Sequence, residues 1–329
     1  MMAFYFVLSP VHKMLRRILY SLVLLSLTGA APSYGQTPVH PQTGPAELNE
    51  FIRQAGLRVS EYRARFKDLT ADEEQAVEEY DGEGRIKKRR QITSELVIYQ
   101  SQLDTSVTAE YRNVRVVDGK AVAKREERLV NLFQRLAKAD SVKKELDRIN
   151  RENQRYDLRY SSHGLTLYQG LPLEEKTRAY FQFTPAGREQ INGRDVLVLQ
   201  YQQAAQIPGF TFDLSLPSVL KGAEPLFRGR LWLDAETAQL WREERELTLR
   251  HPSLVRPLVF MRFEFDYAAS NFGVLTPRRI VFSTYTRGQM GADKHPELLL
   301  GGKVVFEYGG FRRFDVTSPD ASLNPPERP

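Results

Sequence analysis

The second half of the chain is built from short stretches in which apolar and polar residues alternate. The clearest stretch runs from 261 to 267, where Met261, Phe263, Phe265 and Tyr267 alternate with charged residues. Because successive side chains of a strand point to opposite faces, this pattern predicts a strand with one buried face and one wet face. Similar strand patterns cover residues 180–184, 196–202, 227–233, 240–249, 278–286 and 304–314.

The first half begins with a helical pattern from Pro45. Apolar residues recur there at steps of three and four, which predicts one apolar stripe on a helix. The stripe consists of Leu48, Phe51, Ile52, Ala55, Val59, Tyr62 and Phe66. Residues 70–123 then change period and contain two turn signals, one at 81–84 and one at Asp118-Gly119. These features predict three or four antiparallel strands.

Residues 124–155 form a charged helical insert between the two groups of strands. One helix face carries Leu129, Leu132, Phe133 and Leu136, and another carries Val142, Leu146 and Ile149. The phase slips at Asp140-Ser141, which favours two capped helices or one kinked helix. No linker separates the strands, so residues 46–317 are expected to be a single domain. We expect a large antiparallel sheet curled around helices, an α+β fold.

The N-terminal segment has the three parts of a secretory signal. Lys13, Arg16 and Arg17 precede an apolar run at 18–27, and small residues follow it. Residues 1–35 are therefore predicted to be a signal peptide cleaved before Gln36, with cleavage after Ala31 or a start at Met14 as alternatives. An uncleaved anchor is the other interpretation, but the run is shorter than the ~20 residues that span a bilayer. We expect a periplasmic or extracellular protein without a later membrane span.

Charge and cysteine content remove several classes of function. The formal charge of +6 falls to +3 once the three cations of residues 1–35 are removed, which is too small for a nucleic-acid-binding surface. The chain has no cysteine, so a thiolate nucleophile or a cysteine-ligated metal is excluded. A proline-rich spacer at 36–45 and a flexible proline-rich tail at 318–329 complete the expected organisation.

Catalytic patterns are weak. After cleavage the histidines would be His40, His163, His251 and His295, none of them spaced as a metal-binding pair. There is no GxSxG elbow. The acidic residues Asp72, Glu73, Glu74, Glu78 and Glu79 face the basic cluster 85–90, and we interpret both as a solvated hairpin with cross-strand charge pairs. The alternative is that the basic cluster binds an anionic headgroup or nucleic acid. We expect no cofactor and no metal.

The segment 204–227 is the strongest candidate for a binding element. It is long, apolar and interrupted by prolines, which is unusual for a connection within a compact domain. It predicts either a lid over an apolar groove or a segment packed permanently on the sheet. The candidate ligand-binding residues are Ile207, Phe210, Phe212, Leu214, Leu216, Phe263 and Phe265.

Several stretches together resemble known exported proteins. GRLWLDAET at 229–237, LWRE at 240–243, the strand at 263–267, LTPRRI at 275–280 and YGGFRRFDV at 308–316 resemble bacterial periplasmic lipoprotein carriers. Residues 117–122 and 125–129 are similar to a family of exported proteins of unknown function, mainly from acidobacteria. The resemblance implies a half-open antiparallel barrel whose concave face, partly filled by helices, holds acyl chains or a hydrophobic partner.

Three functions follow from these patterns. The first is a non-catalytic, carrier-like protein that binds a lipid, an acyl chain or a hydrophobic protein segment by apolar burial. The second is an interaction protein of the envelope whose sheet is filled. The third is a hydrolase built from scattered carboxylates. A continuous apolar groove would favour the first, a filled sheet the second, and two close inward carboxylates the third.

Overall fold

The computed structural model of the chain describes residues 44–101, 103–104, 106–158, 164–208, 222–290 and 296–313. The expected signal peptide and tail lie outside these residues, and their boundaries stay predictions. In the described part of the chain, no helix is both long and apolar enough to cross a bilayer.

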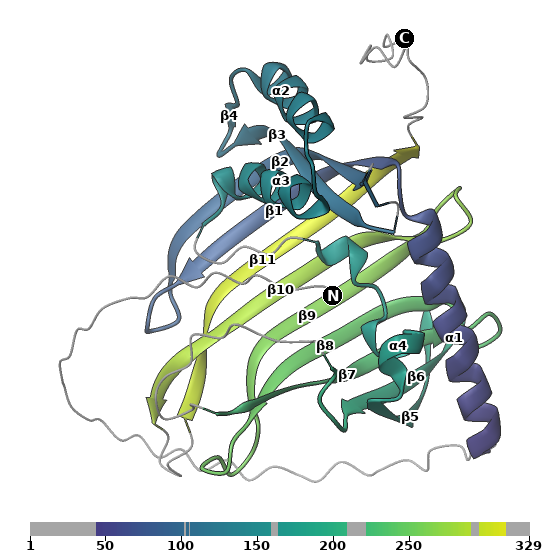
Figure 1. Cartoon of the computed structure of the whole chain (residues 1–329). Helices are drawn as coiled ribbons and strands as arrows, with labels where there is room; N and C mark the ends of the chain where they lie inside the picture. Colours follow the sequence, from purple (N-terminus) through teal and green to yellow (C-terminus); the bar gives the residue numbers. More distant parts are fainter. Residues whose placement is uncertain are drawn as a thin grey trace.

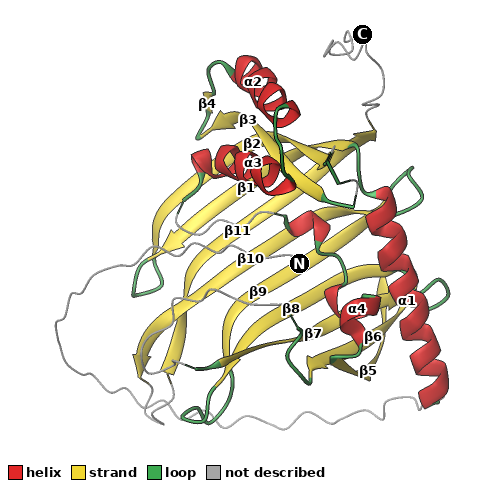
Figure 2. Ribbon diagram, in the orientation of Figure 1, coloured by secondary structure: helices red, strands yellow, loops and turns green. Residues whose placement is uncertain are grey.

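One antiparallel sheet of eleven strands dominates the described residues (Figure 2). Its strands are β1 (Leu69–Tyr80), β2 (Ile86–Gln100), β3 (Thr108–Val117), β4 (Lys120–Ala121), β5 (Phe181–Ile191), β6 (Arg194–Gln203), β7 (Glu224–Asp234), β8 (Leu240–Arg250), β9 (Leu258–Ala269), β10 (Leu275–Met290) and β11 (Pro296–Arg313). Their spatial order is β4-β3-β2-β1-β11-β10-β9-β8-β7-β6-β5. The sheet is open, with β4 and β5 at its edges, so the predicted fold class is confirmed.

The sheet consists of two meanders. They join where β1, the first strand in sequence, pairs with β11, the last strand in sequence. Each strand of β1–β4 and of β5–β11 pairs with its neighbours in sequence, as short connections favour. The meanders join because β1 pairs with β11, beginning with Leu69 opposite Arg313. Residues from the two ends of the described chain therefore form the middle of the sheet.

The alternation in β9 defines the two faces of the sheet. Phe263 and Phe265 are buried on what we call the inner face, as predicted, with 7% and 1% of their surfaces exposed. Arg262 and Glu264 point to the opposite, outer face. Helix α1 (Pro45–Arg65) crosses the strands at one side of the sheet (Figure 1) and belongs to the same hydrophobic core as the inner face.

Helix α1 follows from the predicted apolar stripe. Pro45 occupies its first turn, where a missing N–H costs nothing, and the Glu47 carboxylate accepts a hydrogen bond from the Gly44 N–H at 3.1 Å. The stripe residues Ile52, Val59 and Tyr62 are buried in the core. Three short 3₁₀ turns (Gln154–Tyr156, Leu165–Leu167, Leu171–Leu173) and α4 (Glu175–Arg178) complete the connection from the insert to β5.

The helical insert packs on the outer face of the sheet. It consists of α2 (Arg125–Ala137) and α3 (Val142–Asn153), which break near the expected cap, where the Ser141 hydroxyl accepts from the Lys144 N–H at 3.4 Å. Val97 and Tyr99 of β2 form a second core with α2 and α3, whereas Leu96 and Ile98 face the first core. The sheet is thus covered by helices on both faces rather than curled around all of them.

The end of α3 also covers an exposed strand edge. Asn153 donates from Nδ2 to the Glu110 carbonyl at 2.8 Å and accepts the Arg112 N–H on Oδ1 at 2.8 Å. The side-chain amide thereby replaces a neighbouring strand at residues 110–112, because the two-residue β4 pairs with β3 only at Val116 and Val117. Covering an edge in this way prevents pairing with other chains.

Candidate binding surface

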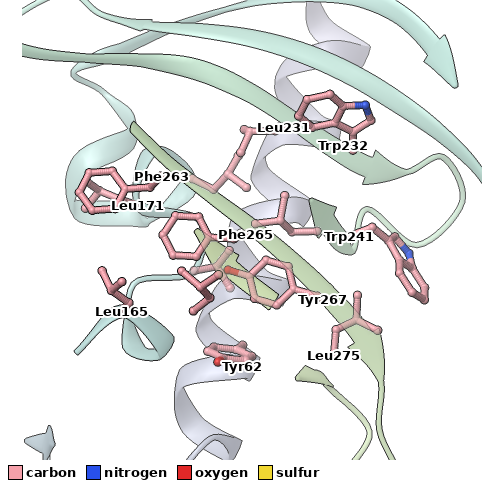
Figure 3. Packing of buried hydrophobic residues seen from close by; sticks show 14 of the residues in the cluster. Tyr62, Leu165, Leu171, Leu231, Trp232, Trp241, Phe263, Phe265, Tyr267 and Leu275 are labelled. Atoms are coloured by element: carbon pink, nitrogen blue, oxygen red, sulfur yellow. The ribbon is translucent and has the colours of Figure 1, made fainter. Parts of the chain in front are cut away.

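The floor of the candidate site is an apolar band across the inner face. In β9, Phe263 stacks on Phe265 at 6.2 Å between ring centroids, and Phe265 stacks on Tyr267 at 6.5 Å. Phe282 of β10 lies 5.0 Å from Phe263, and Phe306 of β11 is fully buried in the same core. Adjacent strands therefore present one continuous aromatic surface, part of which is drawn in Figure 3.

Residues 164–178, which we call the anchored segment, lie on part of this floor. Figure 3 shows its Leu165 and Leu171 among the same core side chains as Phe263 and Phe265. Its position is set by polar contacts as well as by apolar packing, because two buried clusters of charged residues on the inner face bind its backbone.

The first cluster is centred on Arg112 of β3. Its guanidinium donates to Glu73 at 2.7 and 3.0 Å and pairs with Glu110 at 3.1 Å, and each of these side chains is at most 3% exposed. Glu110 accepts from the N–H groups of Gly164 and Thr166, both at 2.7 Å. The beginning of the anchored segment is therefore bound by a carboxylate that the arginine holds in place.

The second cluster is centred on Glu243 and Arg245 of β8. Their side chains pair at 2.7 Å and are 0% and 5% exposed. Glu243 accepts from the Gly170 N–H at 3.0 Å and from the Tyr201 hydroxyl at 3.2 Å, while Arg245 donates to the Tyr168 carbonyl at 2.9 Å. Both charges thus bind the backbone of the anchored segment.

Close packing at Gly170 shows how tightly the segment is seated. Gly170 adopts φ +59°, and an added Cβ would lie 2.5 Å from Cγ2 of Val59 in α1. Glycine is required there for its backbone conformation and for the close approach. Helix α1 and the anchored segment therefore cover this part of the floor together.

Two groups in and beside these clusters, Arg112 and Tyr201, have a raised pKa. Burial disfavours the charged form of Arg112, but the charges of Glu73 and Glu110 outweigh it and the pKa of Arg112 lies well above its usual value. Burial, followed by the charge of Glu243, raises the pKa of Tyr201 well above 10. A general acid or base must reach a substrate, whereas these buried carboxylates bind arginine and backbone. The arrangement anchors a chain segment.

Beyond the anchored segment, the floor remains apolar. Arg245, which binds that segment, stands opposite Phe263. Two residues further along β8, on the same face, Leu247 stands opposite Met261. Phe282 of β10 and Val304 of β11 are paired with each other and continue the band across the sheet. All of these apolar side chains are at most 7% exposed.

The structure places three of the seven predicted ligand-binding residues. Phe263 and Phe265 belong to the apolar band, and Ile207, 7% exposed, belongs to the same core. Phe210, Phe212, Leu214 and Leu216 lie outside the described residues. The lid at 204–227 therefore stays a prediction, although its last residues, from Glu224, form β7.

The interpretation of the acidic stretch at 72–79 is partly wrong. Glu78 pairs with Arg89 at 2.8 Å, and Glu79 lies 4.0 Å from Lys88, as a charge-paired hairpin requires. Glu73, however, is fully buried on the inner face and binds Arg112. Strand alternation places Glu73 on the same face as Gln75. The acidic residues on either side of Glu73 hide this signal in the sequence.

Sequence reasoning also missed Glu110, Arg112, Glu243 and Arg245. A signal exists for the second pair, because Glu243 and Arg245 share the phase of the apolar Leu247 in one strand. Two opposite charges spaced by two residues on an otherwise buried strand face indicate a buried ion pair.

Comparisons with known proteins return distant structural matches only. No family model matches the chain, and no curated protein is similar to it in sequence. A domain of Vibrio parahaemolyticus described as an outer membrane lipoprotein-sorting protein matches with a TM-score of 0.34 and 12% identity, over 83% of this chain and 97% of that one. A DUF1329 family protein of Desulfovibrio piger has a TM-score of 0.34 and 10% identity, over 84% and 96%.

A LolA superfamily protein of Nitrosomonas europaea has a TM-score of 0.33 and 8% identity, over 82% of this chain and 94% of that one. The resemblance to an acidobacterial family stays a prediction.

Proposed function

We propose that this protein is an exported, non-catalytic binding protein that holds an amphiphile or a hydrophobic protein segment on the inner face of its sheet. The observation that supports this function is the apolar band that continues past the anchored segment through Leu247, Met261, Phe282 and Val304. Export, with cleavage before Gln36, belongs to the same proposal and rests on the sequence of residues 1–35.

The chemistry of the band suits an acyl chain or an apolar side-chain row. Apolar surface gains about 25 cal/mol per Å² when it leaves water, without any directed bond. Aromatic rings belong to this band, and those of Phe263 and Phe282 stack on each other with their centroids 5.0 Å apart. Binding by burial requires no catalytic residue, which agrees with the engagement of the buried carboxylates by arginine.

A second candidate is an interaction protein whose inner face is permanently filled. The observation in its favour is the anchored segment, which is bound by two buried ion-pair clusters and packs against Val59 and Leu240. In this case the surfaces that meet partners would be elsewhere, and the inner face would serve stability only.

The two candidates predict different effects of filling the band with a larger side chain. Thr284, 6% exposed, stands opposite Met261 and Gly302 on the inner face, so Thr284→Trp adds volume there. In a binding protein, this variant should weaken binding of the neutral probe N-phenyl-1-naphthylamine with little loss of stability. In a filled sheet, the same variant overpacks the core and costs about 1–3 kcal/mol.

The matched control is Glu307→Trp, on the exposed outer face of β11. The measurements are fluorescence titration of the purified mature protein and native mass spectrometry for a co-purifying lipid. Probe binding that Thr284→Trp weakens and Glu307→Trp leaves unchanged supports the binding protein. A parent protein that binds neither probe nor lipid refutes it and leaves the filled-sheet candidate.

A further inference from the structure

A row of charged residues with alternating signs crosses the outer face of the sheet. The strand register places its members side by side on β7, β8, β9, β10, β11, β1 and β2. They are, in order, Arg228, Glu246, Arg262, Ser283, Lys303, Glu78 and Arg89. The sign alternates at every position except Ser283, where a negative charge would complete the series.

Ion pairs form on both sides of this break. Glu246 pairs with Arg228 at 2.8 Å and with Arg262 at 2.5 Å, and Glu78 pairs with Arg89 at 2.8 Å. These contacts use Nε and Nη2 of Arg262. Within the described residues, Nη1 of Arg262 and Nζ of Lys303 form no hydrogen bond and no ion pair, so two cations flank Ser283 with donors to spare.

A hollow of about 250 Å³ opens at this position. Besides Arg262, Ser283 and Lys303, its walls include Arg279 and Tyr285, so it combines three cations with two hydroxyl groups. Arg279 is held only weakly among the described residues, by a contact of 3.9 Å with Glu307. Among the described residues, the lining contains a single carboxylate, that of Glu264, so cations outnumber carboxylates in the lining itself.

We propose that this hollow binds a phosphate group, carried either by free phosphate or by the headgroup of a phospholipid. Neighbouring strands are about 5 Å apart, so an anion above Ser283 is within reach of side chains from both adjacent strands. Charge-assisted bonds from Arg262 and Lys303 and hydroxyl bonds from Ser283 and Tyr285 suit the several oxygens of a phosphate.

Glu264 determines where in the hollow the phosphate lies. It stands opposite Val281, one row away from Ser283, and its charge repels an anion from that side. The phosphate is therefore directed toward Ser283 and Tyr285. A larger hollow of about 690 Å³ on the same face shares Arg262 and Glu264 with the first. Its other two cations are paired, Arg230 with Glu244 at 2.7 Å and Arg228 with Glu246 at 2.8 Å.

The test uses the mature protein and a variant that supplies the missing charge. Ser283→Glu should complete the charge series and abolish phosphate binding, while Tm stays the same or rises by about 1–3 °C. Lys303→Gln should weaken binding about tenfold, through loss of one charge-assisted bond. The control is Gln200→Glu, which adds the same charge beside Arg230 on the outer face and should leave affinity within about twofold, as expected for a distant site.

Two titrations distinguish the source of the phosphate. Calorimetry measures inorganic phosphate binding at constant ionic strength, with chloride as the competing anion. Co-flotation measures binding to phosphatidylcholine vesicles with and without phosphatidylglycerol. Binding of inorganic phosphate that Ser283→Glu abolishes supports a free-phosphate site, and binding of the phosphatidylglycerol vesicles alone, again lost in Ser283→Glu, supports a headgroup site.

No binding in either titration refutes the site, as does equal loss of binding in Ser283→Glu and Gln200→Glu. The outcome is independent of the proposed function, because Ser283 and the apolar band lie on opposite faces of the sheet.

Discussion

The buried pair of Glu243 and Arg245 allows a direct test of how the anchored segment is held. The perturbation is Glu243→Ala, which removes the carboxylate and leaves the guanidinium of Arg245 in an apolar core with 5% of its side chain exposed. Removing one partner of a buried ion pair costs about 3–5 kcal/mol, because the remaining charge has lost its compensation.

Two further donors lose their acceptor in the same variant. The Gly170 N–H and the Tyr201 hydroxyl both donate to Glu243, at 3.0 and 3.2 Å. A buried donor without a partner costs about 1–3 kcal/mol, and these costs overlap with that of the charge. We therefore expect Glu243→Ala to lower the free energy of unfolding by about 4–5 kcal/mol.

Urea unfolding of the mature protein measures this change, and amide hydrogen exchange locates it. Exchange should accelerate in the anchored segment, residues 164–178, before other parts of the sheet. The matched control is Glu244→Ala, which breaks a surface pair with Arg230 at 2.7 Å and should cost about 0–1 kcal/mol. A loss below 1 kcal/mol for Glu243→Ala, or unchanged exchange in the segment, would refute the anchoring role.

Three other predictions follow from the structure. Phe263→Ala truncates a core side chain and should lower the free energy of unfolding in urea by about 3–5 kcal/mol, whereas Glu264→Ala should lower it by about 0.5 kcal/mol or less. Equal losses in the two variants would contradict the assignment of Phe263 to the buried face and Glu264 to the outer face. Asn153→Ala uncovers an edge of β3, so it should lower the free energy of unfolding by about 1–3 kcal/mol and increase self-association in analytical ultracentrifugation. A variant that stays monomeric would argue against this role of Asn153. Burial, followed by nearby carboxylates, raises the pKa of Tyr201 and Tyr308 well above 10, so their stabilising contribution is complete below pH 10 and declines above it. Tyrosinate absorbance that reaches its full value before unfolding at alkaline pH would contradict this last prediction.

The local parts of this fold could be predicted from sequence because they depend on short-range periodicity. The stripe from Ile52 to Tyr62 predicts α1, and the alternation at 261–267 predicts both the strand and the face on which Phe263 lies. These features require only that one side of an element is buried. They do not require knowledge of what buries it.

The long-range parts could not be predicted in the same way. Pairing of β1 with β11 joins Leu69 to Arg313, and no local signal specifies a partner so distant in sequence. The packing of α2 and α3 on the outer face depends on Val97 and Tyr99, which alternate with equally apolar residues of the opposite face. A strand that is apolar on both faces indicates burial on both but does not say which element covers which face.

The charged clusters on an apolar floor need a reason beyond stability. Replacing a buried ion pair with apolar residues of similar volume is often neutral or stabilising, so Glu243 and Arg245 do not have to be charged for the sheet to be stable. What the charges add is direction, since they bind the backbone at Gly170 and Tyr168, which an apolar pair cannot do. The double variant Glu243→Leu/Arg245→Met should therefore lose less stability than Glu243→Ala, about 1–3 kcal/mol from the donors at Gly170 and Tyr201 that lose their acceptor, while its anchored segment exchanges faster. Greater binding of the apolar probe by this variant would show that the segment and a ligand compete for the same floor. Unchanged binding would place the ligand on the part of the band that begins at Met261.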